Sequence, residues 1–246
     1  MAAASAVVVL CVARSAHAVR PFITDDARVV EPGPFLLETS GRWDRTRLSN
    51  LNLLAYSPVG GLEATVGFSD GVVLERGENM DRPGISGPLL QLKYLFTEGT
   101  PNGYPGVALA AGLNAPFGTR GFAPPSTNGF AFLALTESFG ENEAVNIHAN
   151  AGCVLVDPGD GLKARLIWGI GTQVRIYRGF HSVSEIISGD PYSDSQGGGL
   201  QIGFRQFLSE RVQIDGNFGS GLWGDPKLPL WLGAGLRAIF DPPWVK

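Results

Sequence analysis

Residues 228–240 read LPLWLGAGLRAIF, and every second residue of this stretch, counted from the first, is apolar. The positions between them include Gly233, Gly235 and Arg237. A period of two predicts a β-strand, because successive side chains of a strand point to opposite faces. One apolar face and one small or charged face are typical of a strand that crosses a bilayer as part of a barrel, with lipid outside and water inside. The stretch therefore predicts a membrane-spanning strand.

The same alternation recurs along the chain. In residues 163–176, Leu166 and Ile170 lie on an apolar face, while Arg165, Gly169 and Arg175 lie on the other. We expect a strand at residues 34–44, 48–57, 61–69, 87–97, 105–115, 129–139, 143–155, 163–176, 180–188, 198–208, 211–220 and 228–240. The connections alternate between short and long. Because outer-membrane barrels have short periplasmic turns, both chain ends are expected in the periplasm.

A water-soluble barrel would show the same alternation with its apolar face inside. However, a barrel of about twelve strands encloses more space than the roughly eight-stranded barrels that side chains can fill. In addition, many of the 34 glycines fall on the polar face, whereas the inner face of a barrel filled by its own side chains needs large residues. Both observations favour an all-β fold: a transmembrane, antiparallel, up-and-down β-barrel of about 12 strands, bacterial outer-membrane type. The expected location is the cell outer membrane.

Aromatic residues support this orientation, because outer-membrane barrels carry aromatic girdles at both interfaces. Several fall near the ends of expected strands: Trp43, Tyr56, Tyr94, Trp168, Tyr177, Trp223 and Trp231. Composition excludes another class: the net charge is -4 and the pI about 5.4, so no basic surface points to nucleic acid. The sequence contains no zinc-type Cys/His cluster, P-loop or dinucleotide fingerprint, so we expect no cofactor and no bound metal.

The two chain ends differ from the barrel. Residues 1–18 combine an apolar run with a small-x-small ending, which indicates a secretory signal peptide cleaved between Ala18 and Val19. Residues 19–33 are polar and interrupted by prolines, and we expect a periplasmic N-terminal segment or a partial plug. The barrel is expected over residues 34–240, and residues 241–246 form a C-terminal tail.

Two stretches resemble known proteins. The strand that ends at Phe240 resembles the terminal strand of bacterial outer-membrane proteins, which implies the barrel-insertion machinery as a partner. Residues 20–33, with the run Thr24-Asp25-Asp26-Ala27-Arg28, resemble together with Glu38 the opening of a predicted outer-membrane transporter family. That family is also catalogued as MetA-pathway phenol-degradation proteins. The resemblance implies a link to aromatic-compound catabolism.

The residues of this opening motif allow two interpretations. Thr24, Asp25 and Asp26 form a turn or helix-cap signature, because their side chains accept hydrogen bonds from the backbone. The adjacent carboxylates could also bind a cation or pair with arginines of the lumen. We expect the segment to dock at the periplasmic mouth of the barrel through Asp25, Asp26 and Arg28. A turn with solvated charges is the alternative.

Ionisable residues of both signs lie on the faces expected to point inward. They are Glu38, Arg42, Glu63, Lys93, Glu137, His148, Arg165, Arg175, Arg205, Asp215 and Arg237. Mutual pairing is one interpretation, because buried charges need partners. The other is a selectivity lining, for which we select Lys93, His148, Arg165, Arg175, Arg205, Asp215 and Arg237. The four arginines of this set are expected to form a cationic strip on neighbouring late strands, which predicts a bias toward anionic solutes.

The function most consistent with these features is passive passage of small solutes, aromatic or anionic, through a porin-like outer-membrane transporter. Lipid and lipopolysaccharide are its expected surroundings. Two alternatives stay open: a rim-active enzyme similar to the outer-membrane phospholipase, and a closed structural or surface barrel. His148 and the Ser182 and Ser184 region show no resemblance to that enzyme's serine motif, so we expect no catalytic residues. The sequence leaves the oligomeric state open.

Overall fold

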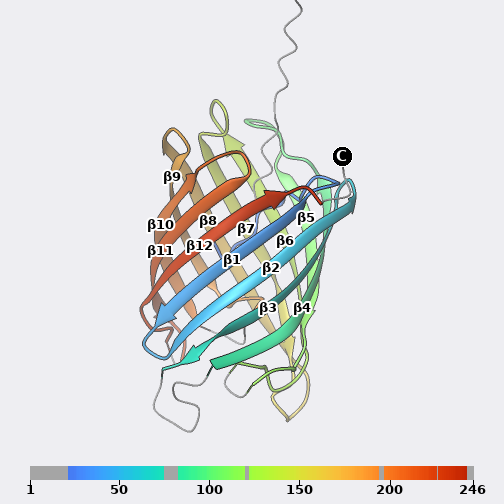
Figure 1. Cartoon of the computed structure of the whole chain (residues 1–246), viewed down its shortest axis with the longest axis vertical. Coiled ribbons are helices and arrows are strands. Elements are labelled where there is room, and N and C mark those ends of the chain that lie inside the picture. The colour runs from blue at the N-terminus through green and yellow to red at the C-terminus, as the bar shows by residue number, and fades with distance from the viewer. Residues whose placement is uncertain (1–21, 75–82, 120–121, 194–196, 226, 243–246) are drawn as a thin grey trace, which may run out of the picture.

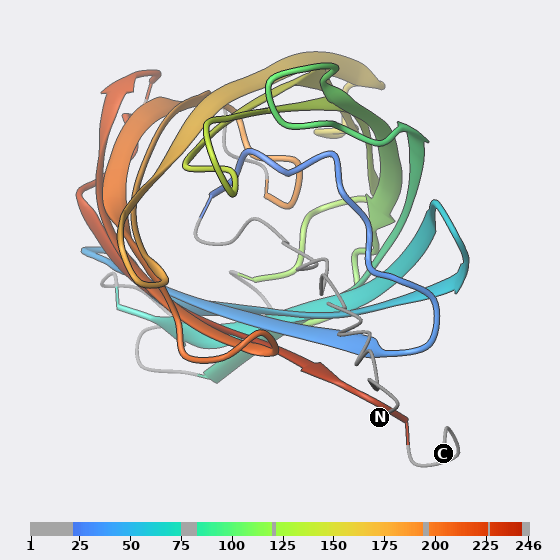
Figure 2. The same ribbon diagram turned by 90° about the horizontal axis from the view of Figure 1, so that it is seen from above.

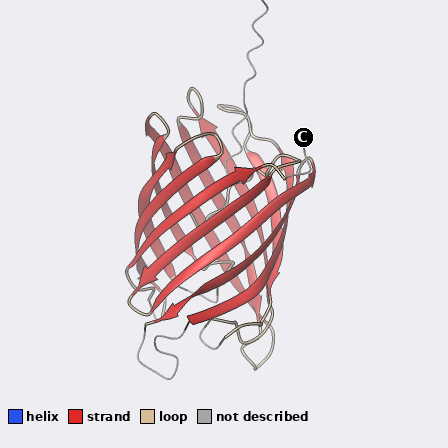
Figure 3. Cartoon of the chain, viewed as in Figure 1, coloured by secondary structure: helices blue, strands red, loops and turns tan. Residues whose placement is uncertain are grey.

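The computed structural model describes residues 22–74, 83–119, 122–193, 197–225 and 227–242. The strands in these ranges are β1 (Phe35–Asp44), β2 (Arg47–Val59), β3 (Leu62–Val73), β4 (Pro83–Thr97), β5 (Gly106–Asn114), β6 (Asn128–Phe139), β7 (Val145–Val156), β8 (Lys163–Tyr177), β9 (Phe180–Ser188), β10 (Gly198–Phe207), β11 (Val212–Trp223) and β12 (Trp231–Phe240). Figure 3 shows them as tilted strands around one barrel. No helix in the described part of the chain is long and apolar enough to span a membrane.

The sheet closes on itself. Each strand runs antiparallel to its neighbours in sequence, and β12 pairs with β1 so that Phe240 lies opposite Phe35 (Figure 1). The turns at this end of the barrel include the tight connections between β2 and β3 and between β8 and β9. We call it the periplasmic end, because short turns mark that side of outer-membrane barrels. The opposite end, with the longer β5–β6 and β9–β10 connections, is the outer end.

The apolar faces of the strands point outward. In β4, Leu92 and Tyr94 are exposed on the outer surface, whereas Gln91 and Lys93 between them are buried inside the barrel. A continuous band of exposed leucine, valine, isoleucine and phenylalanine side chains around a closed sheet is unfavourable in water and favourable in hydrocarbon. The barrel therefore spans a membrane, and the polar faces line its interior.

The interior is not polar throughout. On β5 to β8, an apolar cluster that includes Ala108, Phe130, Phe132 and Val154 occupies part of the inner wall. The remaining wall carries most of the buried ionisable groups, such as Arg205 and Arg237. The sequence pattern left the face of residues 129–139 ambiguous, because both faces contain apolar residues. The structure resolves this by placing the even-numbered residues of β6 inside.

All of the strands expected from the sequence are confirmed, with differences at their ends. The final strand begins at Trp231 rather than at residue 228. Pro229 has no backbone N–H to donate to a neighbouring strand, which explains the later start. Trp231 was expected in an aromatic girdle, but it points inward and is only 3% exposed. Trp43, Tyr56, Tyr94 and Tyr177 are exposed, as girdle residues should be.

Candidate functional site

The N-terminal segment (Phe22–Gly33) lies inside the barrel. Figure 2, seen from the periplasmic end, shows it crossing the lumen before the chain enters β1. Phe22, Thr24, Asp26, Ala27 and Val30 of this segment are all buried. The segment has no regular secondary structure, so its backbone groups need partners from the wall. These partners define the candidate site.

Glu185 of β9 binds the start of the segment. Its two carboxylate oxygens accept hydrogen bonds from the backbone N–H groups of Ile23 (2.8 Å) and Thr24 (2.9 Å). Gln201 of β10 donates a third bond to the same carboxylate, at 2.6 Å. Ala27 packs into the apolar cluster on β5 to β8. One inward carboxylate thus fixes two consecutive residues of the segment.

Asp25 is held by its backbone and by its side chain. Its N–H donates to Asn150 Oδ1 at 2.5 Å, and Asn150 Nδ2 donates to the Asp25 carbonyl at 2.9 Å. The Asn150 side chain therefore bonds both to the N–H and to the carbonyl of Asp25, as the backbone of a neighbouring strand would. The Asp25 carboxylate forms an ion pair with Lys93 of β4, with 2.9 Å between Oδ2 and Nζ.

Asp26 is fully buried and joins the segment to β6. Its Oδ1 accepts hydrogen bonds from the Thr136 hydroxyl and the Arg28 N–H, each at 2.9 Å, and its Oδ2 accepts one from Arg28 Nε at 2.7 Å. Arg28 also pairs with Glu143 in the β6–β7 turn, at 2.8 Å. Burial alone would raise the pKa of the Asp26 carboxyl, but the Arg28 guanidinium, acting together with the nearby His148 and Lys93, outweighs burial and holds the pKa well below its usual range.

This pKa shift predicts how docking of the segment depends on pH. A lowered pKa in the docked state means that Asp26 stabilises docking fully above its free value of about 3.9, and that this contribution is lost only as the pH falls through the lowered value. A nitroxide on Glu31→Cys, an exposed position, in a Cys153→Ser background should therefore stay immobile from about pH 7 to about pH 4. Release with a midpoint near neutral pH would show that a different group controls docking.

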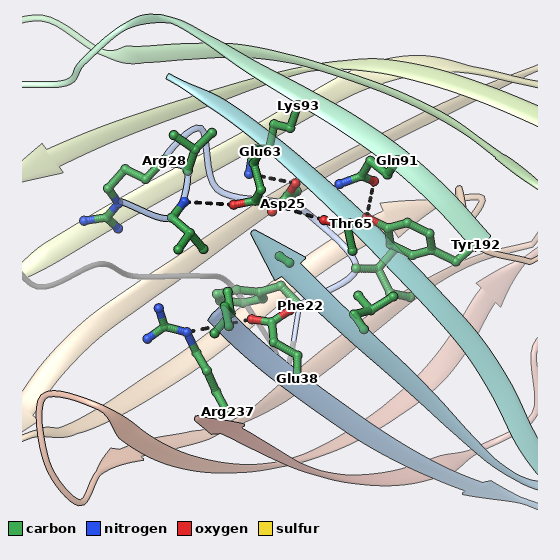
Figure 4. A pocket seen from close by; sticks show the side chains of 16 residues that line it. Phe22, Asp25, Arg28, Glu38, Glu63, Thr65, Gln91, Lys93, Tyr192 and Arg237 are labelled. Atoms are coloured by element: carbon green, nitrogen blue, oxygen red, sulfur yellow. Dashed lines mark hydrogen bonds and ion pairs between the residues drawn. The ribbon is translucent and has the colours of Figure 1, made fainter. Parts of the chain in front are cut away.

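A small cavity remains between the segment and the wall formed by β1 to β4 and β12. Its volume is about 40 Å³, and Figure 4 shows the charged side chains around it. Glu63 accepts a hydrogen bond from the Val30 N–H at 2.9 Å. Arg237 Nε lies 3.9 Å from Glu38 Oε1. Both signs of charge therefore border this cavity.

A much larger chamber, of about 610 Å³, opens on the outer side of the segment. The guanidinium of Arg42 lies over the Trp231 ring at 4.3 Å, and that of Arg47 lies over Phe122 at 4.8 Å. Tyr192, from the β9–β10 connection, reaches inward and donates to Gln91 Oε1 at 3.0 Å. Stacking on aromatic rings holds the guanidinium planes while their edges can still donate hydrogen bonds.

The structure brings most of the selected charges to the periplasmic half of the lumen. Lys93, His148, Arg205, Asp215 and Arg237 are all buried on the inner wall. His148 Nδ1 lies 3.0 Å from the Thr136 hydroxyl, Arg205 donates to Gln173, and Asp215 is opposite Arg205 in register.

The four arginines do not form one strip. Arg165 lies near the outer end of β8, whereas Arg175 lies at the periplasmic end of the same strand and donates to the carbonyls of Glu141 and Asn142. Ten residues of strand separate them, which is about 33 Å. Glu137 was expected on the inward face, but Thr136 occupies that face and Glu137 points outward.

Several site residues were not identified from the sequence: Thr136, Asn150, Glu185, Gln201 and Tyr192. Each contacts a partner more than fifteen residues away. The alternation of apolar and polar residues in the sequence places Asn150 and Gln201 on inward faces, but it does not reveal their partners. Among the described residues, no group of three or more His, Cys, Asp or Glu side chains is placed to hold a metal ion.

The closed sheet, apolar exterior and polar lumen define an outer-membrane type of β-barrel. No protein-family model and no curated protein matches the sequence. Solved structures match in fold, among them an outer membrane channel from Pseudomonas putida F1 with a TM-score of 0.66 and 12% identity, covering 87% of this chain and 98% of that one.

Two porins are also similar. The KdgM porin, solved in complex with disordered oligogalacturonate, has a TM-score of 0.58 and 7% identity over 84% of this chain and 99% of its own. The NanC porin has a TM-score of 0.53 and 8% identity over 85% of this chain and 99% of its own. At these identities the similarity establishes the twelve-stranded outer-membrane fold alone.

Proposed function

We propose that the protein is a passive channel for small solutes in the outer membrane and that the N-terminal segment is its partial plug. The observation that carries this proposal is the lumen itself: a chamber of about 610 Å³ lies on the outer side of the segment, and a cavity of about 40 Å³ lies beside the segment. The structurally similar channel and porins support the same function. Planar-bilayer recording tests it, because a barrel that conducts no ions under any condition would contradict a channel.

The proposed solutes are small organic anions, including aromatic acids. Arg42 and Arg47 present two cationic groups to the chamber, and each lies over an aromatic ring. Asp44 and Asp190 line the same chamber, and Arg42 Nε lies 3.6 Å from Asp44 Oδ2, so a bound anion would share Arg42 with Asp44. The apolar cluster that includes Phe130 adjoins Tyr192, which lines the same chamber. A planar solute with one carboxylate matches both features. The resemblance of residues 20–38 to the transporter family linked to phenol degradation agrees with this solute class.

Selectivity should depend on these two arginines. Reversal potentials across a salt gradient should show a preference for chloride over potassium, and Arg42→Gln with Arg47→Gln should reduce it, because the chamber loses its two cations. Lys163→Gln is the matched control, since it removes an exposed charge outside the chamber. Cation selectivity of the unmodified protein, or an equal effect of the control, would contradict the proposed solute class.

An enzymatic role has less support. In the described part of the chain, neither His148 nor His181 is hydrogen-bonded to a serine hydroxyl: His148 meets Thr136, and His181 meets Gln173 at 3.1 Å. Ser184 points outward and bonds to Thr172. We also propose that β12, ending at Phe240, is the segment read by the barrel-insertion machinery, and that lipopolysaccharide surrounds the outer half of the wall.

A further inference from the structure

Four polar side chains lie together on the outward, lipid-facing side of the wall. We call them the outward polar patch: Thr39 of β1, Asn50 and Asn52 of β2, and Asp70 of β3. Their orientation follows from the strand register. Asn52 is opposite Phe68 and Asp70 is opposite Ile85, and both of these apolar partners are exposed on the outer surface. Figure 1 shows β1, β2 and β3 side by side in the wall.

The patch is a connected hydrogen-bond network. The Thr39 hydroxyl lies 3.0 Å from Asn50 Oδ1 and 2.9 Å from Asn52 Oδ1. Asn50 Nδ2 donates to Asn52 Oδ1 at 3.0 Å, and Asn52 Nδ2 donates to Asp70 Oδ1 at 2.7 Å. Within the described residues, Asp70 Oδ2 accepts no hydrogen bond. Asn52 Nδ2 has two protons and, among the described residues, one acceptor, so the patch retains an unused acceptor and an unused donor.

The patch lies between the two aromatic ends of the wall. At the periplasmic end, Phe35 contacts Tyr56 and Phe240, with ring centroids 4.8 and 5.8 Å away. At the outer end, Trp43 is 54% exposed. Thr39 is four residues from Trp43 and Asn52 is four residues from Tyr56, each about 13 Å along its strand. Asn50, which is opposite Asp70, lies nearer the outer end, two residues or about 7 Å from the position opposite Trp43. The network therefore reaches into the hydrocarbon region, where acyl chains offer no hydrogen bonds.

A charged group in this position is unfavourable unless a polar partner covers it. Lipid headgroups lie at the interfaces, so a protein surface within the membrane is the better match. A second copy of this chain supplies both missing groups, because the patch carries one open donor and one open acceptor. Gly41 and Ala234 lie beside Asn50 in register, and such small side chains allow two walls to approach closely.

We propose that the outward polar patch is the contact through which two copies of this chain associate side by side in the membrane. Two copies inserted in the same direction are related by a two-fold axis along the membrane normal, which preserves depth. Asn52 Nδ2 and Asp70 Oδ1 are 2.7 Å apart within one copy, so these two side-chain ends lie at similar depth. Asn52 of each copy can therefore donate to Asp70 Oδ2 of the other. This proposal is independent of whether the lumen conducts.

Self-association of the purified barrel tests the proposal, measured by light scattering after size exclusion in mild detergent. The unmodified protein should form a dimer, and Asn52→Leu with Asp70→Leu should weaken the dimer by about tenfold, the loss expected for two membrane hydrogen bonds. The matched control is Thr172→Val with Ser184→Ala, an outward pair on β8 and β9 whose hydroxyls bond to each other at 2.8 Å. The control should dimerise like the unmodified protein.

Crosslinking in native membranes gives a second measurement that does not depend on detergent or on the leucine variants folding. In a Cys153→Ser background, oxidation should crosslink Asn50→Cys to itself and leave Thr172→Cys monomeric. Anomalous migration of unboiled protein on a gel confirms that each variant is a folded barrel. A monomeric unmodified protein that also gives no Asn50→Cys crosslink would overturn the proposal, as would a dimer that the two leucine substitutions leave intact.

Discussion

Deleting Phe22–Gly33 is expected to raise the single-channel conductance several-fold. The segment occupies the lumen and leaves a cavity of about 40 Å³ beside it. A cavity needs roughly 10–15 Å³ to hold one water, so this one holds only a few waters and excludes an organic solute. The outer chamber, at about 610 Å³, is large enough for one. Passage of a solute therefore requires the segment to move, and its removal should join the chamber to the periplasmic mouth.

Planar-bilayer recording of the deletion variant measures this effect, and swelling of liposomes in small organic acids measures solute flux. The barrel should still fold, because the strand pairings that close it do not involve the segment. Glu31→Ala is the control, since it alters an exposed residue of the segment without removing a contact to the wall. Conductance equal to that of the unmodified protein would show that the segment does not limit the pore.

The sequence predicted the barrel because its pattern is local. Alternation within each strand follows from one face meeting lipid and the other the lumen, so Leu90, Leu92 and Tyr94 could be assigned without knowledge of any neighbour. The assignment failed where a residue type suits both faces. As a tryptophan near a strand end, Trp231 suits an aromatic girdle. The alternation of faces along β12, however, places it on the lumen face, where Arg42 lies over its ring.

The candidate site was only partly predictable, because its contacts join distant parts of the chain. The motif Thr24-Asp25-Asp26 indicated a docking segment, yet Glu185, which binds its backbone, is about 160 residues away. Nothing in the sequence near Glu185 distinguishes it from any other inward glutamate. The outward polar patch was also hidden, since polar residues at Asn50 and Asn52 stand out only after Leu53 is known to face the lumen.

Asp26→Ala is expected to weaken docking of the segment by about 3 kcal/mol. Removing one partner of a buried ion pair typically costs about 3–5 kcal/mol, because the other charge is left without compensation. The lower value applies here, since the Arg28 side chain is 21% exposed and keeps its second pair with Glu143. Thr136 would also lose the carboxylate that its hydroxyl contacts. A change of about 3 kcal/mol shifts the ratio of docked to released segment by about a hundredfold.

The mobility of a nitroxide at residue 31 and the open-channel fraction in bilayers both measure this release. Glu143→Gln is the matched control: its pair with Arg28 is 32% exposed on the Glu143 side, and exposed pairs contribute only about 0–1 kcal/mol. Replacing both partners, as Asp26→Leu with Arg28→Met, should weaken docking of the segment less than Asp26→Ala alone, since no unpaired charge remains. If Asp26→Ala and Glu143→Gln release the segment equally, the buried carboxylate is not its principal anchor, and Glu185 and Asn150 hold the segment instead.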